Sequence, residues 1–207
     1  MCWFAESPSL NKAVKEGNLM GDEYTMQEFI RDVQSIMDSG KAREFVVAEV
    51  TPLVSRIMQR DDLLQDEYRH QGDDGRFSYM FYRSDDESLT ISAPAFLPGR
   101  PTPVHDHVTW GVIGVYSGRQ KTTRYQRLDD GKREGHADLR LIGEDVYGRG
   151  TVYPLLPPND IHRIEAVGDE PGISLHVLGM DPSTLKRHIF DPEQGIVQDW
   201  DGGSMTR

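Results

Sequence analysis

The sequence predicts a mainly β protein, a sandwich or a barrel, with helices packed on it. From about residue 76, short β-rich runs alternate with turns of Gly, Pro and Asp, which is typical of all-β folds and not of βαβ units. The residues before this point carry helical periodicity instead. A length of 207 residues suits a single domain. We therefore expect residues 1–75 to form a helical segment packed on a barrel of residues 76–207.

Two helices are expected in the first segment. Thr25 to Glu28 forms the Ser/Thr-x-x-Glu pattern in which side chain and backbone cap each other at a helix start. Apolar residues follow at helical spacing as far as Gly40. A second helical pattern covers residues 46–58, and Pro52 inside it marks a kink or the first turn of a new helix. Each helix has one apolar face, so each should pack on something larger.

The β-rich region divides into eight expected strands. They cover residues 77–83, 89–96, 108–116, 119–127, 137–142, 150–155, 161–166 and 172–178. The polar tail from Asp199 to Arg207 contains glycine and is expected to be frayed.

Composition excludes several classes of function. The chain has 34 acidic and 23 basic residues, a net charge of -11, which repels phosphate backbones and argues against a nucleic-acid partner. No apolar run approaches the roughly 20 residues that a membrane-spanning helix needs. Cys2 is the only cysteine, so an intrachain disulfide and a thiolate-rich zinc site are excluded. The first residues lack the features of a signal peptide, and we expect a cytoplasmic protein.

Three of the seven histidines are placed as metal ligands would be. His105 and His107 are two residues apart, so in a strand both rings face one side. His162 lies on a later expected strand. Imidazole nitrogen suits Zn, Fe, Cu and Ni, although a His-x-His pair alone is often only a solvated strand face. Three further histidines lie in polar surroundings and are expected at the surface: His70, His136 and His188.

The surrounding residues resemble the cupin superfamily, whose motifs run Gly-x5-His-x-His-x(3–4)-Glu-x6-Gly and Gly-x5-Pro-x-Gly-x2-His-x3-Asn. Residues that match the first motif are Gly99, His105, His107 and Gly118, and those that match the second are Pro157 and His162. Asn159 replaces a motif glycine, and Gly111 stands where the glutamate ligand is usual. The resemblance implies an RmlC-like jelly roll, also called a double-stranded β-helix. It also implies a neutral metal site of His105, His107 and His162.

Among three-histidine cupins, this sequence resembles the bacterial thiol dioxygenases, the family of cysteine dioxygenase and 3-mercaptopropionate dioxygenase. The likeness covers roughly residues 77–182 and is carried by residues 102–115, 160–165 and 174–177. It implies an enzyme that uses Fe(2+) and O2 to oxidise a small thiol to a sulfinic acid. Three imidazoles would also accept Zn, Ni, Co or Cu.

The family's Ser-x-His-x-Tyr relay is only partly present. Ser174 and His176 match it and would tune protonation beside the metal, whereas Leu178 replaces the tyrosine. Tyr79 stands at the place of the substrate-binding arginine. Arg83, on the same expected strand face, either binds a substrate carboxylate or is a surface residue.

Two aromatic residues complete the expected substrate contacts. Trp110 either lines the substrate pocket or fills the core. Tyr125, or alternatively Tyr116, could supply the hydroxyl that is lost where Leu178 replaces the family's tyrosine. Two other functions remain open: a three-histidine dioxygenase for a carbon acid such as a β-diketone, and a metal-binding or ligand-binding cupin without turnover. The expected partners are the small substrate and O2, and a monomer and a homodimer are equally compatible with the sequence.

Overall fold

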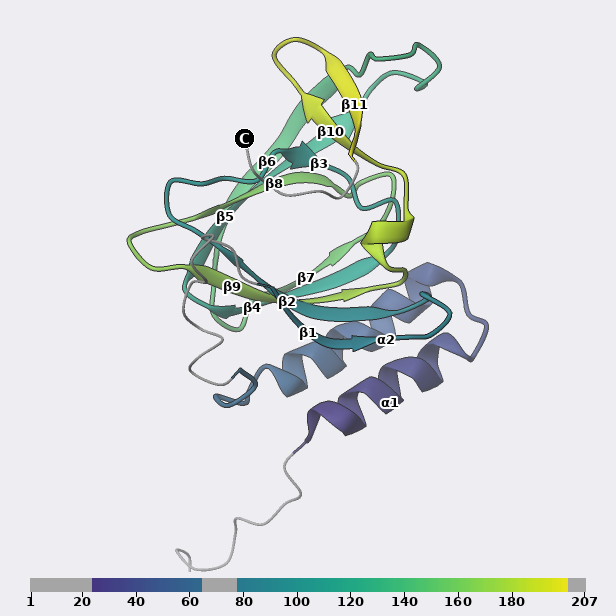
Figure 1. Cartoon of the computed structure of the whole chain (residues 1–207), viewed down its shortest axis with the longest axis vertical. Coiled ribbons are helices and arrows are strands. Elements are labelled where there is room, and N and C mark those ends of the chain that lie inside the picture. Colours follow the sequence, from purple (N-terminus) through teal and green to yellow (C-terminus); the bar gives the residue numbers. More distant parts are fainter. Residues whose placement is uncertain (1–23, 65–77, 201–207) are drawn as a thin grey trace, which may run out of the picture.

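The computed structural model describes residues 24–64 and 78–200. Two antiparallel sheets face one another, and two helices lie against the outside of one of them (Figure 1). The helices are α1 (Met26–Met37) and α2 (Arg43–Ile57), with a short 3-10 helix at Pro182–Thr184. The strands are β1 (Ser78–Arg83), β2 (Thr90–Phe96), β3 (Val104–His105), β4 (Gly111–Ser117), β5 (Arg119–Arg127), β6 (Leu139–Gly148), β7 (Val152–Leu155), β8 (Ile161–Ala166), β9 (Gly172–Leu178), β10 (Arg187–Asp191) and β11 (Ile196–Trp200).

The strand order is that of a jelly roll. One sheet runs β1-β2-β9-β4-β7 and the other β11-β10-β3-β8-β5-β6. The strands from β2 to β9 therefore divide into β2-β9-β4-β7 and β3-β8-β5-β6, an eight-stranded double-sheet arrangement that cupins use. The expected mainly β cupin fold with two N-terminal helices is confirmed.

Eight of the strands were expected from the sequence, and their bounds agree with the structure to different degrees. β5, β8 and β9 have the expected bounds, whereas β4 begins at Gly111, because Val108 has a φ of 60°, which no strand residue adopts. β3, β10 and β11 were not expected. The tail prediction is wrong for Asp199 and Trp200, which end β11, and the rest of the tail lies outside the described residues.

Both helices form for the reasons that the sequence suggests. Thr25 and Glu28 complete a capping box: the Glu28 N–H donates to Thr25 Oγ1 (3.2 Å) and the Thr25 N–H donates to Glu28 Oε2 (2.8 Å). Pro52 lies within α2, which continues past it as one helix. No helix in the described ranges is long and apolar enough to cross a membrane.

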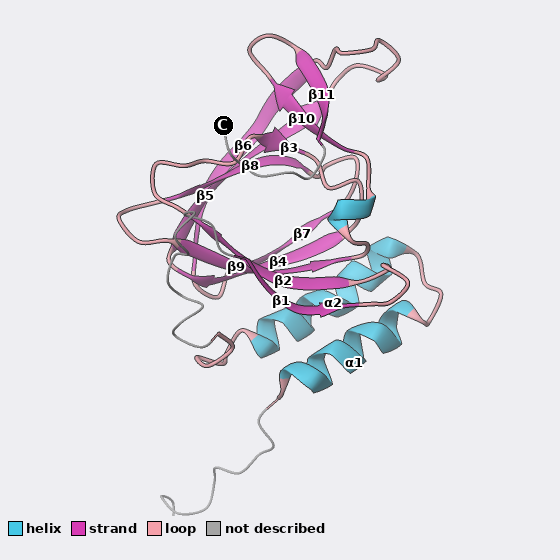
Figure 2. Cartoon of the chain, viewed as in Figure 1, coloured by secondary structure: helices cyan, strands magenta, loops and turns pink. Residues whose placement is uncertain are grey.

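The main core lies between the helices and the first sheet, and strand alternation separates it from the barrel interior. Figure 2 shows both helices on the outer face of the sheet that contains β9. Ile173, Leu175 and Val177 of β9 belong to the cluster formed with the helices. Ser174, His176 and Leu178 therefore face the opposite side, into the barrel. Burial of each apolar side chain in this core contributes about 1.5–3 kcal/mol.

Candidate metal centre

Three buried histidines, one in β3, one just after it and one in β8, converge inside the barrel. His105 ends β3 and is the direct cross-strand partner of His162 in β8, while His107 follows two residues after His105. Their ring centroids are 4.8–5.1 Å apart, and one nitrogen from each ring lies within 4.8 Å of the others. Each side chain is almost fully buried. This group, the three-histidine cluster (His105, His107 and His162), is the only such metal-capable set among residues 24–64 and 78–200.

The nitrogen geometry fits a bound cation. His107 Nε2 and His162 Nε2 lie 3.2 Å apart. Two nitrogens bound to one ion at about 2.1 Å, at angles between octahedral and tetrahedral, are separated by roughly 3.0–3.4 Å. His105 Nδ1 lies 3.0 Å from the Pro103 carbonyl oxygen and, as the donor there, leaves Nε2 unprotonated for a metal. The cluster could therefore hold a metal ion through three neutral imidazoles.

Asp160 fixes the backbone that carries His107. Its Oδ2 accepts the N–H groups of His107 (2.9 Å) and Val108 (2.8 Å). Val108 has a left-handed φ of 60°, which is costly for a β-branched residue. The carboxylate thus stabilises a strained turn just after the second histidine. That turn ends β3, and it directs His107 into the interior although His107 is outside the strand.

Burial keeps the histidines neutral. It lowers the pKa of His162 and of His176 to about 3, with the charge of Arg187 adding to the effect at both. The pKa values of His105 and His107 are also lowered, first by burial and then by the neighbouring His162. At neutral pH the imidazoles therefore offer lone pairs, and protons compete with a metal only in acid.

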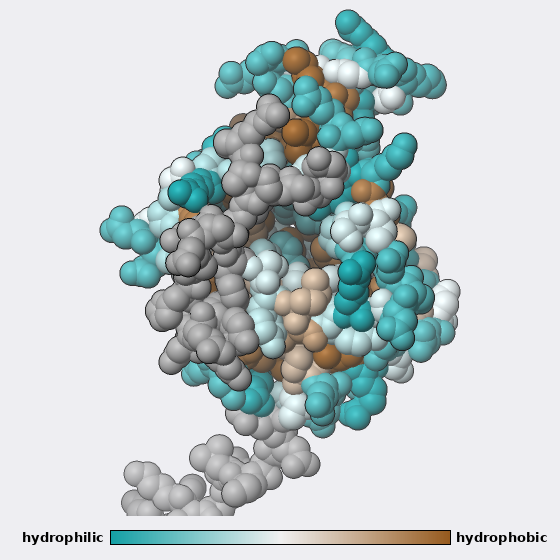
Figure 3. Space-filling view, viewed as in Figure 1, coloured by the Kyte–Doolittle hydropathy of each residue, from teal (hydrophilic) through white to brown (hydrophobic). Residues whose placement is uncertain are grey.

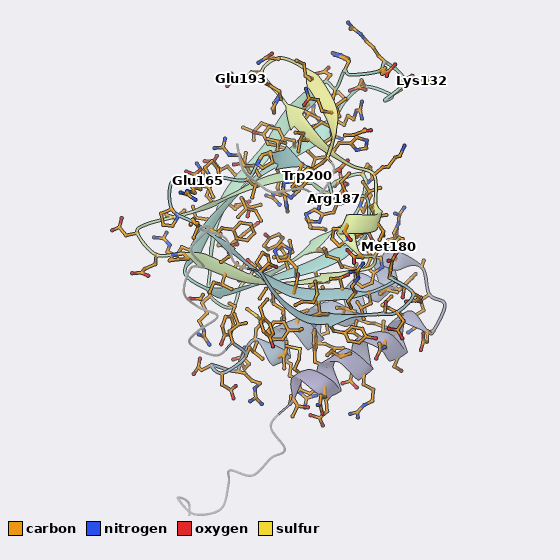
Figure 4. All side chains as sticks on the ribbon, viewed as in Figure 1. Lys132, Glu165, Met180, Arg187, Glu193 and Trp200 are labelled. Carbon is orange, nitrogen blue, oxygen red and sulfur yellow. The ribbon has the colours of Figure 1, made fainter. Side chains whose placement is uncertain are left out.

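A buried arginine beside the cluster was not expected from the sequence. Arg187, in β10, is 8% exposed, and its guanidinium lies 4.2 Å from the ring centroid of Trp200. Its Nε donates to the Asp106 carbonyl oxygen (3.0 Å), and no hydrogen bond of its terminal nitrogens occurs within the described residues. Burial lowers the pKa of Arg187 to about 10, so it stays cationic at neutral pH. Figure 4 places Arg187 and Trp200 side by side at the opening between the sheets.

The hairpin of β10 and β11 positions this arginine. Ile189 of β10 pairs with His105, which adds the hairpin to the edge of the sheet that carries the cluster. Trp200 packs edge-on against the His105 ring, with centroids 5.1 Å apart. Figure 3 shows a hollow between the two sheets on the face where the hairpin lies. An arginine followed by a turn and a tryptophan is a weak sequence signal, and only the hairpin pairing brings both to the histidines.

Asp106, between the first two histidines, anchors the same hairpin. Its carboxylate accepts the His188 N–H at Oδ1 (2.7 Å), and Oδ2 lies 2.6 Å from His188 Nδ1. The expectation that His188 is exposed is therefore corrected: its side chain is 33% exposed and bonded to Asp106. The same expectation is wrong for His136, which is half-buried beside β11, and the expectation for His70 lies outside the described residues.

Ser174 and His176 face the interior but are not bonded to each other. The Ser174 hydroxyl donates to Gln120 Oε1 (2.7 Å). Ser174 is therefore bonded to Gln120, whereas in the family's relay it would be bonded to His176. The His176 ring lies 6.4 Å from that of His107, and its Nε2 is buried without a partner. His176 thus presents a free nitrogen near the cluster.

The two departures from the cupin and thiol dioxygenase patterns are neighbours. Gly111, at the glutamate position, pairs across the strands with Leu178, at the tyrosine position. A Cβ added to Gly111 would lie 2.7 Å from Leu178 Cδ2. Leu178 therefore occupies the space into which a side chain at position 111 would extend, and the cluster has no carboxylate from β4.

The structure does not bring Tyr79 or Arg83 to the cluster. Tyr79 pairs with Ala93 and packs in the core under the helices. A register shift between Met80 and Tyr82 puts Arg83 on the other face, which corrects the expectation of a shared face. Arg83 forms an ion pair with Asp181, and its side chain is 47% exposed. Arg187, and not Arg83, is therefore the arginine whose charge acts on the histidines.

Trp110 and Tyr125 also lie elsewhere. Trp110 belongs to the core under the helices and packs closely against Gly179, which agrees with its core-filling alternative. Tyr125 packs with Ile161, on the face of the second sheet opposite to that of His162. Tyr116, the alternative donor, is buried in the helix-side core, where its hydroxyl donates to the Asp61 carbonyl oxygen. None of these aromatic residues lines the cluster.

Comparisons with known proteins give distant likenesses. No protein-family model matches the chain. An uncharacterised double-stranded β-helix protein from Klebsiella pneumoniae matches with a TM-score of 0.44 and 14% identity over 63% of this chain and 93% of its own. A cupin-like protein from Thermotoga maritima matches with a TM-score of 0.40 and 17% identity over 66% of this chain and 98% of its own. A hydroquinone 1,2-dioxygenase, solved with Cd2+ and 4-hydroxybenzonitrile, matches with a TM-score of 0.36 and 17% identity over 46% of this chain and 60% of its own.

Likenesses this distant assign neither a substrate nor a metal. The fold and the site together define the class: a jelly-roll protein of the cupin type whose interior holds a three-histidine cluster that could bind a metal ion.

Proposed function

We propose that this protein is an Fe(2+)-dependent dioxygenase that oxidises a small thiol carrying a carboxylate to the sulfinic acid, RSH + O2 → RSO2H. The observation that carries the proposal is the guanidinium end of the buried Arg187, which has no hydrogen bond to the described residues and lies beside three neutral histidines. The cation offers a site for an anionic substrate next to a metal site without a carboxylate ligand.

The ligand set supports iron chemistry with an anionic substrate. Three neutral imidazoles leave the full charge of a divalent ion in place and leave coordination positions open. When bound, iron would supply the activation of O2 and of the thiolate. Leu178, packed against Gly111, keeps a protein carboxylate away, so the substrate itself would bring the negative donor.

Arg187 supports the choice of a carboxylate as the second substrate group. Its Nε is held by the Asp106 carbonyl oxygen and its plane lies over Trp200, so the terminal nitrogens are fixed in orientation. A guanidinium fixed in this way binds a carboxylate through two parallel hydrogen bonds. Because the cation is buried, a charge-assisted hydrogen bond to it contributes about 1.5–3 kcal/mol.

His176 is the proposed proton acceptor for the thiol. Its Nε2 is buried and unpaired, and the low pKa keeps it neutral before substrate binds. Ser174 donates to Gln120 and is not the hydrogen-bond partner of His176. The negative charge of the bound substrate would raise the pKa of His176, so that His176 could take up the thiol proton.

The test is oxygen uptake by protein loaded anaerobically with Fe(2+). We would offer 3-mercaptopropionate, cysteine, cysteamine and a β-diketone in parallel, with His162→Ala as the control for the metal. Uptake with the carboxylate thiols, sulfinic acid as product and silence in the control are expected. Uptake with the diketone alone would instead identify a carbon-acid oxygenase, and no uptake at all despite bound iron would leave a binding protein.

Arg187→Gln separates the carboxylate contact from the metal site. We expect kcat/KM for 3-mercaptopropionate to fall about 10- to 100-fold, because a charge-assisted hydrogen bond is lost. Cysteamine has no carboxylate, and its slow reaction should be unaffected. Equal losses for both thiols would contradict the role given to Arg187.

A further inference from the structure

Besides the three-histidine cluster, a second set of polar side chains faces the barrel interior. Tyr153 of β7 and His176 of β9 are both cross-strand partners of Ile113, so the two side chains project from the same face of the sheet. On the opposite sheet, Arg124 of β5 is the direct partner of His162. Thr122, two residues before Arg124, faces the same side. We call Thr122, Arg124 and Tyr153 the Tyr153 corner.

The Tyr153 corner contains three buried polar atoms without hydrogen-bond partners. They are Thr122 Oγ1, Arg124 Nε and Tyr153 Oη. The Tyr153 and Thr122 hydroxyls are close enough to interact with each other, the charge of Arg124 acts on Tyr153, and neither hydroxyl has a partner elsewhere among the described residues. Buried polar groups are nearly always paired, and an unpaired one is costly. Three in one place indicate that something outside the protein satisfies them.

The Tyr153 corner is held in place by its neighbours. Tyr147 stacks on Tyr153 with ring centroids 4.9 Å apart. Arg124 forms an ion pair with Asp145 through a terminal nitrogen, which leaves its Nε directed elsewhere. Gly143 makes room for this arrangement, because a Cβ there would lie 2.8 Å from Arg124 Nη2. The donors are therefore oriented before any ligand arrives.

The charges of the Tyr153 corner select a neutral ligand group. Asp145 neutralises Arg124, and burial raises the pKa of Tyr153 to about 12, so the phenol remains a donor. An acceptor that needs no counter-charge, such as an amide or ketone oxygen, matches this set. A carboxylate is better matched by Arg187, which has no ion-pair partner among residues 24–64 and 78–200.

We propose that the Tyr153 corner binds a neutral carbonyl oxygen of the substrate. The natural substrate would then be a thiol acid with a free thiol and an additional acyl group, as in N-acetylcysteine, and not 3-mercaptopropionate itself. Since the inference rests on the proposed thiol chemistry, the substrate would reach from Arg187 and the metal to Tyr153. Its carboxylate would then bind Arg187, its sulfur the metal, and its carbonyl oxygen the Tyr153 corner.

The test is anaerobic calorimetric titration of the Fe(2+)-loaded protein with two thiols. N-acetylcysteine and 3-mercaptopropionate both carry a thiol and a carboxylate, and only the first has an amide oxygen. We expect wild type to bind N-acetylcysteine about 3- to 10-fold tighter, the effect of one neutral hydrogen bond. Tyr153→Phe should abolish this preference and leave the Kd of 3-mercaptopropionate unchanged.

Each outcome decides between the proposals. If both thiols bind equally well to wild type, or if Tyr153→Phe keeps the preference, the acyl contact is overturned and the thiol chemistry stands. If neither thiol binds, the proposed function and this inference fall together.

The ligand-free protein provides an independent measurement. Tyr153→Phe and Thr122→Val remove hydroxyls that have no partner, so Tm should stay the same or rise. A fall in Tm for both variants would show that the hydroxyls are bonded within the fold, which would overturn the assignment.

Discussion

Asp160 has the clearest single-residue role near the cluster, and its removal gives the first prediction. Asp160→Ala leaves the N–H groups of His107 and Val108 without their acceptor. We expect the free energy of unfolding to fall by about 1–3 kcal/mol for the buried N–H group of His107, with a smaller loss for the part-buried N–H group of Val108. Metal affinity should fall about 10- to 100-fold as His107 loses its support. Urea unfolding and metal titration measure the two effects.

Asp160→Asn is the matched control, because its amide oxygen still accepts both N–H groups. It should retain most of the stability and the metal affinity. If Asn proves as damaging as Ala, the carboxylate acts through its charge and not through these hydrogen bonds.

Gly111 and Leu178 are coupled, which gives the second prediction. Gly111→Ala places a Cβ within 2.7 Å of Leu178 Cδ2 and should destabilise the protein by about 1–3 kcal/mol. Leu178→Ala removes that clash, so the double variant should be more stable than the sum of the single effects by about 0.5–3 kcal/mol. Gly148→Ala is the control, since nothing lies within 4 Å of a Cβ there. Additive effects in the double variant would contradict the coupling.

Residue patterns predicted the histidines and not the arginine. The spacing of His105, His107 and His162 within motif-like surroundings was enough to bring them together, and the structure agrees. The face of Tyr79 was predicted incorrectly relative to Arg83, because a one-residue register shift in β1 cannot be read from alternation. Arg187 could not be found, because its position depends on a pairing between β10 and β3 of only two residue pairs.

At the level of elements, the β10–β11 hairpin closes one side of the site, and Trp200 gives the third prediction. Its ring contacts both the Arg187 guanidinium and the His105 ring. Trp200→Ala should lower the free energy of unfolding by about 1–2 kcal/mol through loss of the cation–π contact. It should also raise KM for a carboxylate substrate, because Arg187 loses its orientation. Unfolding curves and oxygen-uptake kinetics measure these changes.

Asp199→Ala is the control for the hairpin. Asp199 lies on the same strand with its side chain exposed, so both quantities should stay close to wild type. An equal loss in both variants would mean that β11 as a whole, and not the tryptophan ring, supports the site.

Long strands with clear turns at both ends were predictable, whereas the short strands that position the site were not. β5, β8 and β9 combine β-rich composition with clear turns at both ends, and their bounds match. β3 has two residues and ends where Asp160 holds a left-handed backbone, so no run of β-forming residues reveals it. β10 and β11 form a short hairpin whose residues alternate weakly in burial.

Taken as a whole, the molecule assigns stability and chemistry to opposite faces of the same strands. On β9 the odd-numbered residues pack under the helices, while Ser174, His176 and Leu178 face the interior. The helix-side core is apolar, whereas the interior contains the histidines and several unpaired polar atoms. Substitutions of the unpaired polar side chains of the interior should therefore change binding more than they change folding.

Metal binding should stabilise the whole fold, which is the fourth prediction. The cluster joins β3 and β8, and an ion bound only by the folded protein adds RT ln(1 + [M]/Kd) to its stability. At a free metal concentration about 1,000 times Kd this is about 4 kcal/mol, a rise in Tm of roughly 8–16 °C for a domain of this size. EDTA should reverse the rise, as calorimetry would record.

Because the net charge of -11 favours loose binding of cations to surface carboxylates, the decisive comparison is His162→Ala against His136→Ala. The rise should vanish in the first variant and persist in the second, and a rise in both would place the metal away from the three-histidine cluster.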